Sequence, residues 1–266
     1  MRKLEEAVPE IDPDRVANEI TEFVRKTVKE ANADGVVVGL SGGLDSSVVA
    51  ALCVRALGRA SVLGIVMPAE FTPKEDTEDA RKLGKQLGMK TSLINIQDTV
   101  ESFFIALQCD RKDVKQKIPM ANIYARTRMI ILYYYANLKN YLVAGTGDRS
   151  EALIGYFTKY GDGAADFLPI IHLYKTQVRE LAEHLGIPER IVCKVSSPQL
   201  YAGHKATDEI PLDYDRLDPV LVGLFDHGFP PMKVSQRTGV PIEVVREVMR
   251  RFNASKHKRE YSPMIC

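Results

Sequence analysis

The spacing of apolar residues indicates where this chain forms helices and where it forms strands. A helix is predicted over 13–32, because apolar residues recur there at intervals of three and four positions. The pair Asp12-Pro13 at its start is typical of a helix N-terminus. The next run, 35–40, is continuously apolar and rich in valine, which is typical of a strand buried on both faces.

The same alternation continues along the chain. Further strands are predicted at 61–67, 91–96 and 141–146, and further helices at 46–57, 73–88, 120–138 and 174–186. Regular alternation of this kind predicts parallel strands joined by right-handed helical crossovers. We therefore expect an α/β fold, with a doubly wound, Rossmann-like parallel β-sheet flanked by helices.

One domain is expected to span residues 1–266, because no linker-like composition divides the chain. It comprises the N-terminal helix 13–32, an α/β core over 35–195, and a lid loop with C-terminal helices over 196–266. Two stretches rich in Gly, Asp and Pro, 147–173 and 196–218, are longer than ordinary connections. Long connections of this composition are typical of lids and binding loops.

The helix predicted at 120–138 contains a segment, Ile130–Tyr135, that is apolar nearly all round. Most helices of a globular protein keep one polar face toward water. This segment therefore needs cover on several sides, and we expect it to lie in the core or against a partner.

Composition excludes several classes of protein. The chain has 36 Lys and Arg against 35 Asp and Glu, a net charge of +1, which argues against a basic surface for nucleic acid. With 45% hydrophobic and 27% charged residues, it is neither a disordered nor a fibrous chain. The four cysteines lie far apart, so neither a zinc site nor a disulfide framework is expected.

No segment of the sequence resembles a membrane span or a signal peptide. The longest uncharged apolar stretch, Met129–Leu138, is about half as long as a bilayer requires. The first residues also lack the apolar run of a signal peptide. We therefore expect a cytoplasmic protein with neither membrane nor nucleic acid as a partner.

The strongest chemical signal follows the first predicted strand. There the sequence GLSGGLDS turns directly into a helix, the position at which ligands bind in doubly wound sheets. Two glycines allow close approach of an anion, and the helix N-terminus attracts it. The segment is therefore predicted to bind phosphates through Gly39, Leu40, Ser41, Gly42, Gly43, Leu44, Asp45 and Ser46.

This segment is neither a Walker A loop nor a G-x-G-x-x-G fingerprint, because no lysine follows Gly43 and the glycine spacing differs. Asp45 stands where a Walker A loop has its lysine. A carboxylate beside a polyphosphate makes electrostatic sense when a divalent cation lies between them. Asp45 is therefore a predicted magnesium ligand; the alternative is an ordinary Gly-Gly turn with Asp45 capping the helix.

The sequence SGGLDS resembles the pyrophosphate-binding loop of the ATP pyrophosphatase superfamily, and three later blocks resemble the NAD synthetase family within it. These blocks are Asn122–Met129, Gly145–Glu151 and Phe157–Asp166. Leu173-Tyr-Lys175 and His257-Lys258-Arg259 continue the likeness. The resemblance spans 35–259 and implies the adenine nucleotide alpha hydrolase-like fold.

The resemblance implies a ligase that uses ATP and Mg²⁺ to amidate deamido-NAD with ammonia. The nicotinate carboxylate attacks the ATP α-phosphorus, pyrophosphate leaves, and ammonia displaces AMP to give NAD. It implies ATP contacts from Gly39–Ser46, Thr146, Lys175 and Ser197, and magnesium ligands Asp45 and Glu151, with Asp45 and Lys175 as catalytic residues. It implies deamido-NAD contacts from Arg126, Lys159, Asp166, His257 and Lys258, in a site assembled across a homodimer interface.

These roles agree with the chemistry of the reaction. Two oxyanions must meet, so cations have to offset their repulsion and stabilise the leaving pyrophosphate. The substrate carboxylate and ammonia are the nucleophiles, so no cysteine or serine nucleophile is needed. Only positions 1–34 precede the first strand, too few for a glutaminase domain of about 100 residues, and free ammonia is the expected nitrogen source.

One segment departs from the family pattern. After a lysine the family usually carries Pro-[Ser/Thr]-Ala-[Asp/Gly]-Leu, whereas this chain reads Ser196-Ser-Pro-Gln-Leu200 after Lys194-Val195. The hydroxyl of Ser197 is kept, but the proline is shifted and Gln199 replaces the acidic residue or glycine.

Several assignments also fit an ordinary structural interpretation. Glu151 fits a first-turn acid that interacts with a helix dipole, and Asp166 fits a turn cap. Arg126 and Lys159 fit solvated surface charges, and the pair His257-Lys258 fits a solvated basic tail.

Two other functions fit parts of the sequence. A GMP synthetase-like or tRNA-modifying relative would share the phosphate loop, but the dispersed cysteines and balanced charge argue against tRNA. The segment Val234–Arg246 has the helix, glycine turn, helix layout of a DNA-binding regulator. A short helical corner that positions His257-Lys258 is the preferred interpretation of that segment.

Overall fold

The computed structural model describes residues 8–195, 201 and 209–260. Four strands form one parallel sheet in the order β3-β2-β1-β4. Their bounds are β1 Gly35–Gly39, β2 Val62–Val66, β3 Lys90–Leu93 and β4 Tyr141–Ala144. The chain reverses its direction of progress through the sheet between β1 and β4, so the ends of these two strands flank the switch point where ligands bind in such folds.

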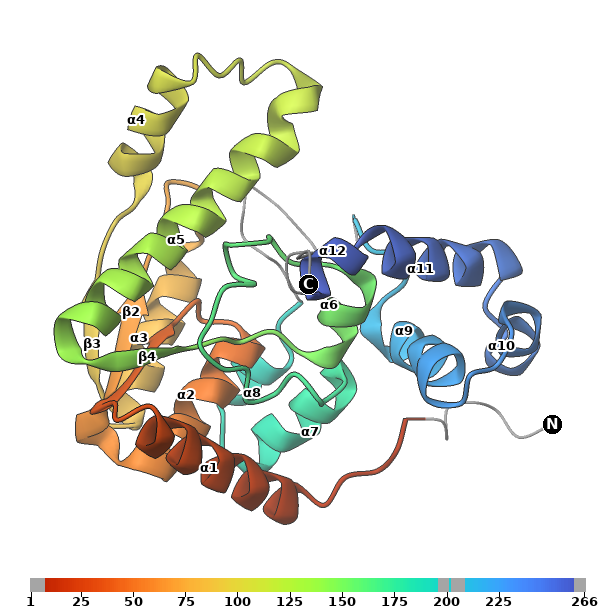
Figure 1. Ribbon diagram of the computed structural model, residues 1–266, viewed down its shortest axis with the longest axis horizontal. Helices are drawn as coiled ribbons and strands as arrows, with labels where there is room; N and C mark the ends of the chain where they lie inside the picture. Colours follow the sequence, from red (N-terminus) through yellow and green to blue (C-terminus); the bar gives the residue numbers. More distant parts are fainter. Residues whose placement is uncertain (1–7, 196–200, 202–208, 261–266) are drawn as a thin grey trace, which may run out of the picture.

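Helices cover both faces of the sheet (Figure 1). One face packs against a group of helices whose side chains share a core with Val36 and Val38 of β1. This group comprises α1 Pro13–Glu30, α2 Leu44–Leu57, α3 Lys74–Gln86, α7 Lys175–His184 and α8 Glu189–Val192. The opposite face, which includes Val37, packs against α4 Gln97–Ala106 and α5 Lys117–Lys139. Alternate residues of β1 are therefore buried on opposite sides, as the unbroken apolar run predicted.

The remaining helices form a third group beside α7 (Figure 1). It comprises α6 Arg149–Ile154, α9 Tyr214–Leu221, a π-helical turn η5 Val222–Asp226, α10 Pro231–Thr238, α11 Ile242–Ala254 and α12 Lys256–Arg259. A separate apolar cluster, centred on Leu217, Leu221 and Val245, holds this group together. Short 3₁₀ turns lie at η2 Arg59–Ser61 and η3 Val114–Gln116.

The predicted fold class is confirmed, and most predicted elements lie within a few residues of their expected bounds. Asp12 caps α1 by accepting a hydrogen bond from the backbone N–H of Arg15 at 3.2 Å. The helix expected from 46 begins at Leu44, which places Asp45 in its first turn. The helix expected from 120 begins at Lys117.

Three helices before residue 195, namely α4, α6 and α8, were not predicted. In α4 only Val100 and Phe104 are buried, while Phe103 and Ile105 are 41% and 77% exposed, so the apolar residues do not form one clear face. Helix α6 lies within the Gly-rich connection after β4 and has six residues, too few to show a period. The lid expected from residue 196 falls largely outside the described residues.

Candidate active site

An open cavity of about 640 Å³ lies at the carboxyl ends of β1 and β4. Its wall combines the loop after β1, the start of α3, one side of α5, the connection after α6, and a lysine from α12. A cavity of this size is in the range of small-molecule sites. Most of the predicted phosphate-binding residues line it, namely Gly39, Leu40, Ser41, Gly43, Leu44, Asp45 and Ser46.

The phosphate loop is held by its own hydroxyl groups. The side chains of Ser41 and Ser46 are hydrogen bonded to each other at 3.0 Å, and Ser46 Oγ donates to the carbonyl of Gly43 at 3.2 Å. Gly43 is the N-cap of α2 and supplies no side-chain acceptor to the first turn. The N-terminus of this helix of 14 residues therefore faces the cavity with its dipole available to an anion.

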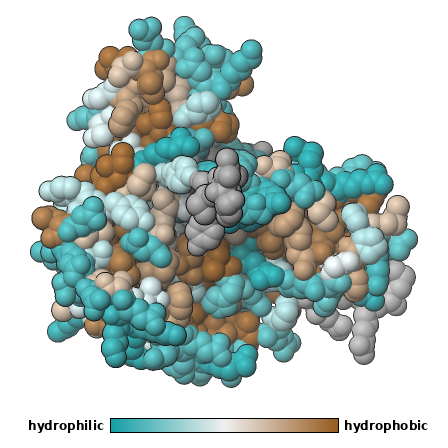
Figure 2. All heavy atoms as spheres, in the orientation of Figure 1, coloured by the Kyte–Doolittle hydropathy of each residue, from teal (hydrophilic) through white to brown (hydrophobic). Residues whose placement is uncertain are grey.

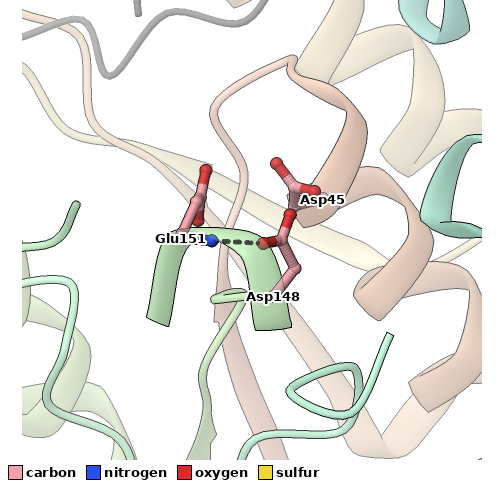
Figure 3. A group of neighbouring side chains, drawn as sticks. All are labelled: Asp45, Asp148 and Glu151. Carbon is pink, nitrogen blue, oxygen red and sulfur yellow. Dashed lines mark hydrogen bonds between the residues drawn. The ribbon is translucent and has the colours of Figure 1, made fainter. Parts of the chain in front are cut away.

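Three carboxylates meet beside this loop (Figure 3). Asp45 comes from the first turn of α2, Asp148 is the N-cap of α6, and Glu151 lies in the first turn of α6. One oxygen of each lies within 4.8 Å of the others. Asp148 also accepts a hydrogen bond from the backbone N–H of Glu151 at 2.8 Å, drawn as a dashed line in Figure 3.

The ammonium of Lys175 lies among these carboxylates, and its side chain is completely buried. Lys175 Nζ is 2.8 Å from Asp45, 2.7 Å from Asp148 and 2.9 Å from Glu151. Lys175 is the first residue of α7. Because α7 packs against α2, the start of α7 places the lysine side chain at the base of the phosphate loop. The predicted catalytic pair Asp45 and Lys175 is therefore in direct contact.

The cluster of Asp45, Asp148, Glu151 and Lys175 has one cation for three carboxylates, which affects its protonation. Burial raises the pKa of Asp148 to about 6 despite the nearby Lys175. Burial also raises the pKa of Glu151 well above its usual value. For Lys175, burial alone would lower the pKa, but the three carboxylates outweigh it and raise the pKa well above normal.

The arrangement fits a divalent cation. Asp45 Oδ1 is buried and accepts no hydrogen bond from the part of the chain that the structure describes, although a buried carboxylate oxygen normally has a partner. Carboxylate oxygens are the preferred ligands of Mg²⁺, and a further positive charge would balance the excess of carboxylates in the cluster. Asp45 and Glu151 also line the cavity, so an ion held there would face a bound ligand.

Asp148 was not predicted as part of the site. Its side chain is fully buried and joins the α6 N-terminus to Lys175. The spacing Asp148-x-x-Glu151 is a helix-start pattern, and this local signal identifies the N-cap. It does not reveal that the same carboxylate faces Lys175, which lies 27 residues further along the chain.

A second buried carboxylate, Asp218 of α9, supports this cluster from behind. It accepts hydrogen bonds from Ser150 Oγ at 2.6 Å, Thr176 N at 2.9 Å and Thr176 Oγ1 at 2.8 Å. Ser150 Oγ in turn accepts from the backbone N–H of Lys175 at 3.0 Å. Asp218 thus ties the starts of α6 and α7 together, which orients Glu151 and Lys175.

Of the predicted dinucleotide-binding residues, Arg126, Lys159, His257 and Lys258 lie in one place and Asp166 in another. Arg126 donates to the carbonyl of Lys159 at 3.3 Å, and Lys159 Nζ donates to the carbonyl of His257 at 2.7 Å. Lys258 lines the cavity and donates to the carbonyls of Gly155 and Phe157 at 2.8 and 2.6 Å. The structure therefore brings together the predicted cations of 122–129, 157–166 and 257–259.

Asp166 and Ser197 are exceptions. Asp166 accepts a hydrogen bond from Val143 N at 2.7 Å and one from Tyr133 OH at 3.3 Å. Its carboxylate is thus bound to the backbone of β4, and Asp166 itself is not among the residues that line the cavity. Ser197 lies outside the described residues, whereas Thr146 lines the cavity as expected.

The cavity wall also contains polar residues of the family blocks for which the resemblance implied no role. They are Asn122, Arg128, Thr158 and Asp162. Asn122 accepts a hydrogen bond from Thr158 Oγ1 at 2.7 Å, and Arg128 donates to the carbonyl of Met67 at 3.2 Å. Both Asn122 and Arg128 lie on the part of α5 that lines the cavity, a placement that the helical period alone leaves undecided.

The predicted helical corner is present. Helices α10 and α11 meet at Gly239, and the corner buries Val234, Val240 and Val245 in the C-terminal cluster. Helix α11 leads directly to α12, which carries His257 and Lys258. Within the described residues, no helix is long and apolar enough to cross a membrane.

Comparison with known proteins identifies relatives over nearly the whole chain. A family model described as NAD synthase matches residues 16–262. The chain is 50% identical to the NH(3)-dependent NAD(+) synthetase of Hyperthermus butylicus, over 96% of this chain and 91% of that protein. It is 47% identical to the same-named protein of Staphylothermus marinus, over 94% and 90% of the two chains.

Solved structures agree with this match. An NMN synthetase from Francisella tularensis superposes with a TM-score of 0.84 at 32% identity, over 96% of this chain and 99% of that one. An NH3-dependent NAD synthetase from Campylobacter jejuni superposes with a TM-score of 0.80 at 31% identity, over 96% and 100% of the chains. The family predicted from the SGGLDS loop and the later blocks is confirmed: this chain belongs to the NAD synthase family.

Proposed function

We propose that this protein is a ligase that forms NAD, AMP and pyrophosphate from deamido-NAD, ammonia and ATP. The relatives named above support the product and the nitrogen source. The observation that carries the proposal is the position of the acidic cluster, directly beside a glycine loop and a helix N-terminus in one cavity. That combination suits a polyphosphate bound with a metal ion.

The first step joins the nicotinate carboxylate to the ATP α-phosphorus. Gly39–Ser46, together with Thr146 and Ser197, are proposed to hold the phosphates, and Asp45 and Glu151 to hold Mg²⁺. A bound magnesium ion offsets charge on the leaving pyrophosphate. Holding both reactants in one cavity converts an encounter of two anions into a step within one complex.

Lys175 is proposed as the second catalytic cation. Its ammonium is buried beneath Asp45 and Glu151 and does not line the cavity. Direct contact with ATP therefore requires Lys175 Nζ to move from the carboxylates toward the phosphates. Until it moves, its charge keeps the three carboxylates together.

Deamido-NAD is proposed to bind Arg126, Lys159, His257 and Lys258, with Asp166 assigned only through the family motif. The second step is attack of free ammonia on the adenylate, which releases AMP. We propose a cytoplasmic location for the protein, because its substrates are a nucleotide and a dinucleotide of central metabolism.

A homodimer is also proposed. The apolar segment of α5 is covered on one side only, because Ile130, Tyr134 and Leu138 are 53%, 61% and 64% exposed. In the view of Figure 2, hydrophobic residues gather over the arm formed by α4 and α5. A second copy of the chain would supply the missing cover.

The test is a product assay with purified protein, ATP, Mg²⁺, ammonium and deamido-NAD, omitting each in turn. We expect NAD, AMP and pyrophosphate in equal amounts, and none without Mg²⁺. Formation of ADP in place of AMP would overturn the proposal, as would activity on XMP or tRNA but not on deamido-NAD.

Nicotinate mononucleotide should be assayed in parallel, because one structural neighbour is an NMN synthetase. A higher kcat/KM for nicotinate mononucleotide would show that it, and not deamido-NAD, is the substrate of the same reaction. Asp45→Asn should abolish turnover in either case. Asp215→Asn, an exposed acid of α9, serves as the matched control and should keep full activity.

A further inference from the structure

Lys194 lies just after α8 and binds the phosphate loop from outside the cavity's acidic cluster. Its ammonium donates to the backbone carbonyl of Gly42 at 2.8 Å, to Asp76 at 2.7 Å and to Asp79 at 2.9 Å. An ammonium has three N–H donors, and these three acceptors use all of them. Lys194 is therefore placed to hold the loop and has no donor left for a phosphate.

The carbonyl that Lys194 holds determines how the peptide between Gly42 and Gly43 is turned. In a trans peptide the C=O and the following N–H point in opposite directions. Gly42 O points to Lys194, and the N–H of Gly43 donates to Ser41 Oγ at 3.2 Å. Ser41 and Gly43 line the cavity, so the N–H lies on their side of the cavity wall. The carbonyl points the opposite way, to Lys194, which also lines the cavity.

This orientation matters to an anion. Backbone N–H groups attract phosphate oxygens, whereas a carbonyl oxygen repels them. Glycine has no side chain to oppose rotation of the peptide, so an external contact is needed to hold it. The Gly42 backbone also lies against α3, because a Cβ at Gly42 would come within 2.1 Å of the Asp76 carbonyl.

The surrounding charges are balanced without any ligand. Asp79 also pairs with Arg190 at 2.9 Å, so Asp76 and Asp79 face two cations, Lys194 and Arg190. Although burial alone would lower the pKa of Lys194, the hydrogen bonds and charges of the two aspartates raise it. Lys194 therefore stays charged and bound within its own cluster.

We infer that Lys194 is a positioning residue for ATP binding: through its bond to the Gly42 carbonyl it keeps the 42–43 peptide N–H turned toward the nucleotide's pyrophosphate end. The inference deepens the proposed function, since it takes ATP as the ligand of the loop. It assigns Lys194 no contact with the reacting atoms.

The test compares equilibrium binding of ATP and of AMP, each with Mg²⁺, to the wild type and to Lys194→Met by titration calorimetry. Methionine keeps the length of the side chain but has no donor. A hydrogen bond from a charged group is worth enough to weaken ATP binding about 10- to 100-fold. AMP lacks the β and γ phosphates, so its affinity should change less than about twofold.

Three further variants separate the bond to Gly42 from charge and from general stability. Arg190→Met breaks a neighbouring ion pair of the same cluster and should leave ATP affinity unchanged. Lys194→Arg keeps charge and donors and should recover most of the loss. Asp79→Asn combined with Lys194→Met restores the charge balance without a donor to Gly42, and ATP binding should remain weak.

The inference is overturned if Lys194→Met binds ATP as the wild type does, or loses ATP and AMP equally, or regains ATP affinity when Asp79→Asn is added. Should Lys194→Met fail to fold, Lys194→Arg and Arg190→Met still test the inference. A loss of ATP affinity in Lys194→Arg but not in Arg190→Met would contradict it, because arginine keeps the charge and the donors. The proposed function fails separately, if wild-type protein makes no NAD.

Discussion

Gly42 shows why single residues of the phosphate loop are constrained. Its φ is +76°, a left-handed conformation, and the Asp76 carbonyl occupies the space that a Cβ would fill. Glycine is therefore required there for two independent reasons, backbone conformation and contact with α3. The two can be separated with a second glycine, Gly186, which has a φ of +68° and no neighbour within 4 Å of an added Cβ.

Gly42→Ala should lower both stability and ATP affinity, whereas Gly186→Ala should lower only stability, by about 1 kcal/mol for the left-handed conformation. Gly42→Ala should cost more than that, because the clash adds to the conformational term. Chemical denaturation and nucleotide titration measure the two effects. Equal losses of stability in the two variants, with ATP binding intact, would contradict this account.

Protonation of the acidic cluster should govern metal binding. The pKa of Asp148 is raised to about 6 by burial, so this carboxyl gains a proton as the pH falls through 6 and the cluster loses negative charge. Metal ligands must be deprotonated. Binding of Mn²⁺, followed by electron paramagnetic resonance from pH 5 to 8, should therefore weaken as the pH falls through about 6.

Asp148→Asn is the control for this titration. It removes one of the two carboxyl groups whose pKa is raised, so metal affinity should be lower at pH 8 and should change less between pH 5 and 7. A pH dependence identical to that of the wild type would assign the titration to another group.

At the scale of elements, the starts of α6 and α7 form the site, and Asp218 of α9 joins them. Its carboxylate is fully buried and receives hydrogen bonds from Ser150 and Thr176. Among the residues predicted to bind the substrate, the C-terminal group of helices contributes only Lys258 to the cavity wall. Through Asp218, the same group also affects the position of the metal-binding residues.

Asp218→Ala should lower the free energy of unfolding by about 3 kcal/mol or more, because it leaves several buried donors unpaired. Turnover should also fall, since Lys175 and Glu151 lose their shared support. Asp215→Ala removes an exposed acid of the same helix, and its ion pair with Arg179 is worth at most about 1 kcal/mol. Denaturant unfolding of both variants tests this, and equal losses would refute the role of Asp218.

The limits of prediction at this scale are physical. Long helices with a clear period, such as α1 and α5, were predicted because their core-facing residues repeat along the chain. Helices α4 and α6 were not predicted, since one buries only Val100 and Phe104 and the other is too short to show a repeat. Asp148 lies at such a short helix, and its role in the site was missed for the same reason.

For the molecule as a whole, the exposed apolar face of α5 is the main feature that one chain leaves unexplained. The sequence predicted that Ile130–Tyr135 needs cover in the core or against a partner. The core covers one side only, and Tyr134 and Leu138 remain more than half exposed. A surface of this kind fits the proposed homodimer.

Light scattering after gel filtration should therefore give twice the 29.7 kDa mass of one chain. The double variant Tyr134→Asp with Leu138→Lys should give a monomer, because it places charges on both exposed positions. Met232→Lys, a 53% exposed residue of α10 far from this face, should remain dimeric. A wild-type monomer at micromolar concentration would exclude this dimer.

Local patterns of residues were enough to predict the alternation of strands and helices, the glycine loop after the first strand and the family. The folded chain was needed to show that Asp45, Asp148 and Glu151 surround one buried lysine, and that Lys194 holds the loop. Asp45 and Lys175 are 130 residues apart, and their distance is set by strand order and helix packing, which no local spacing encodes. The secondary structure of a segment follows from its own residues, whereas contacts between distant segments depend on how the whole core packs.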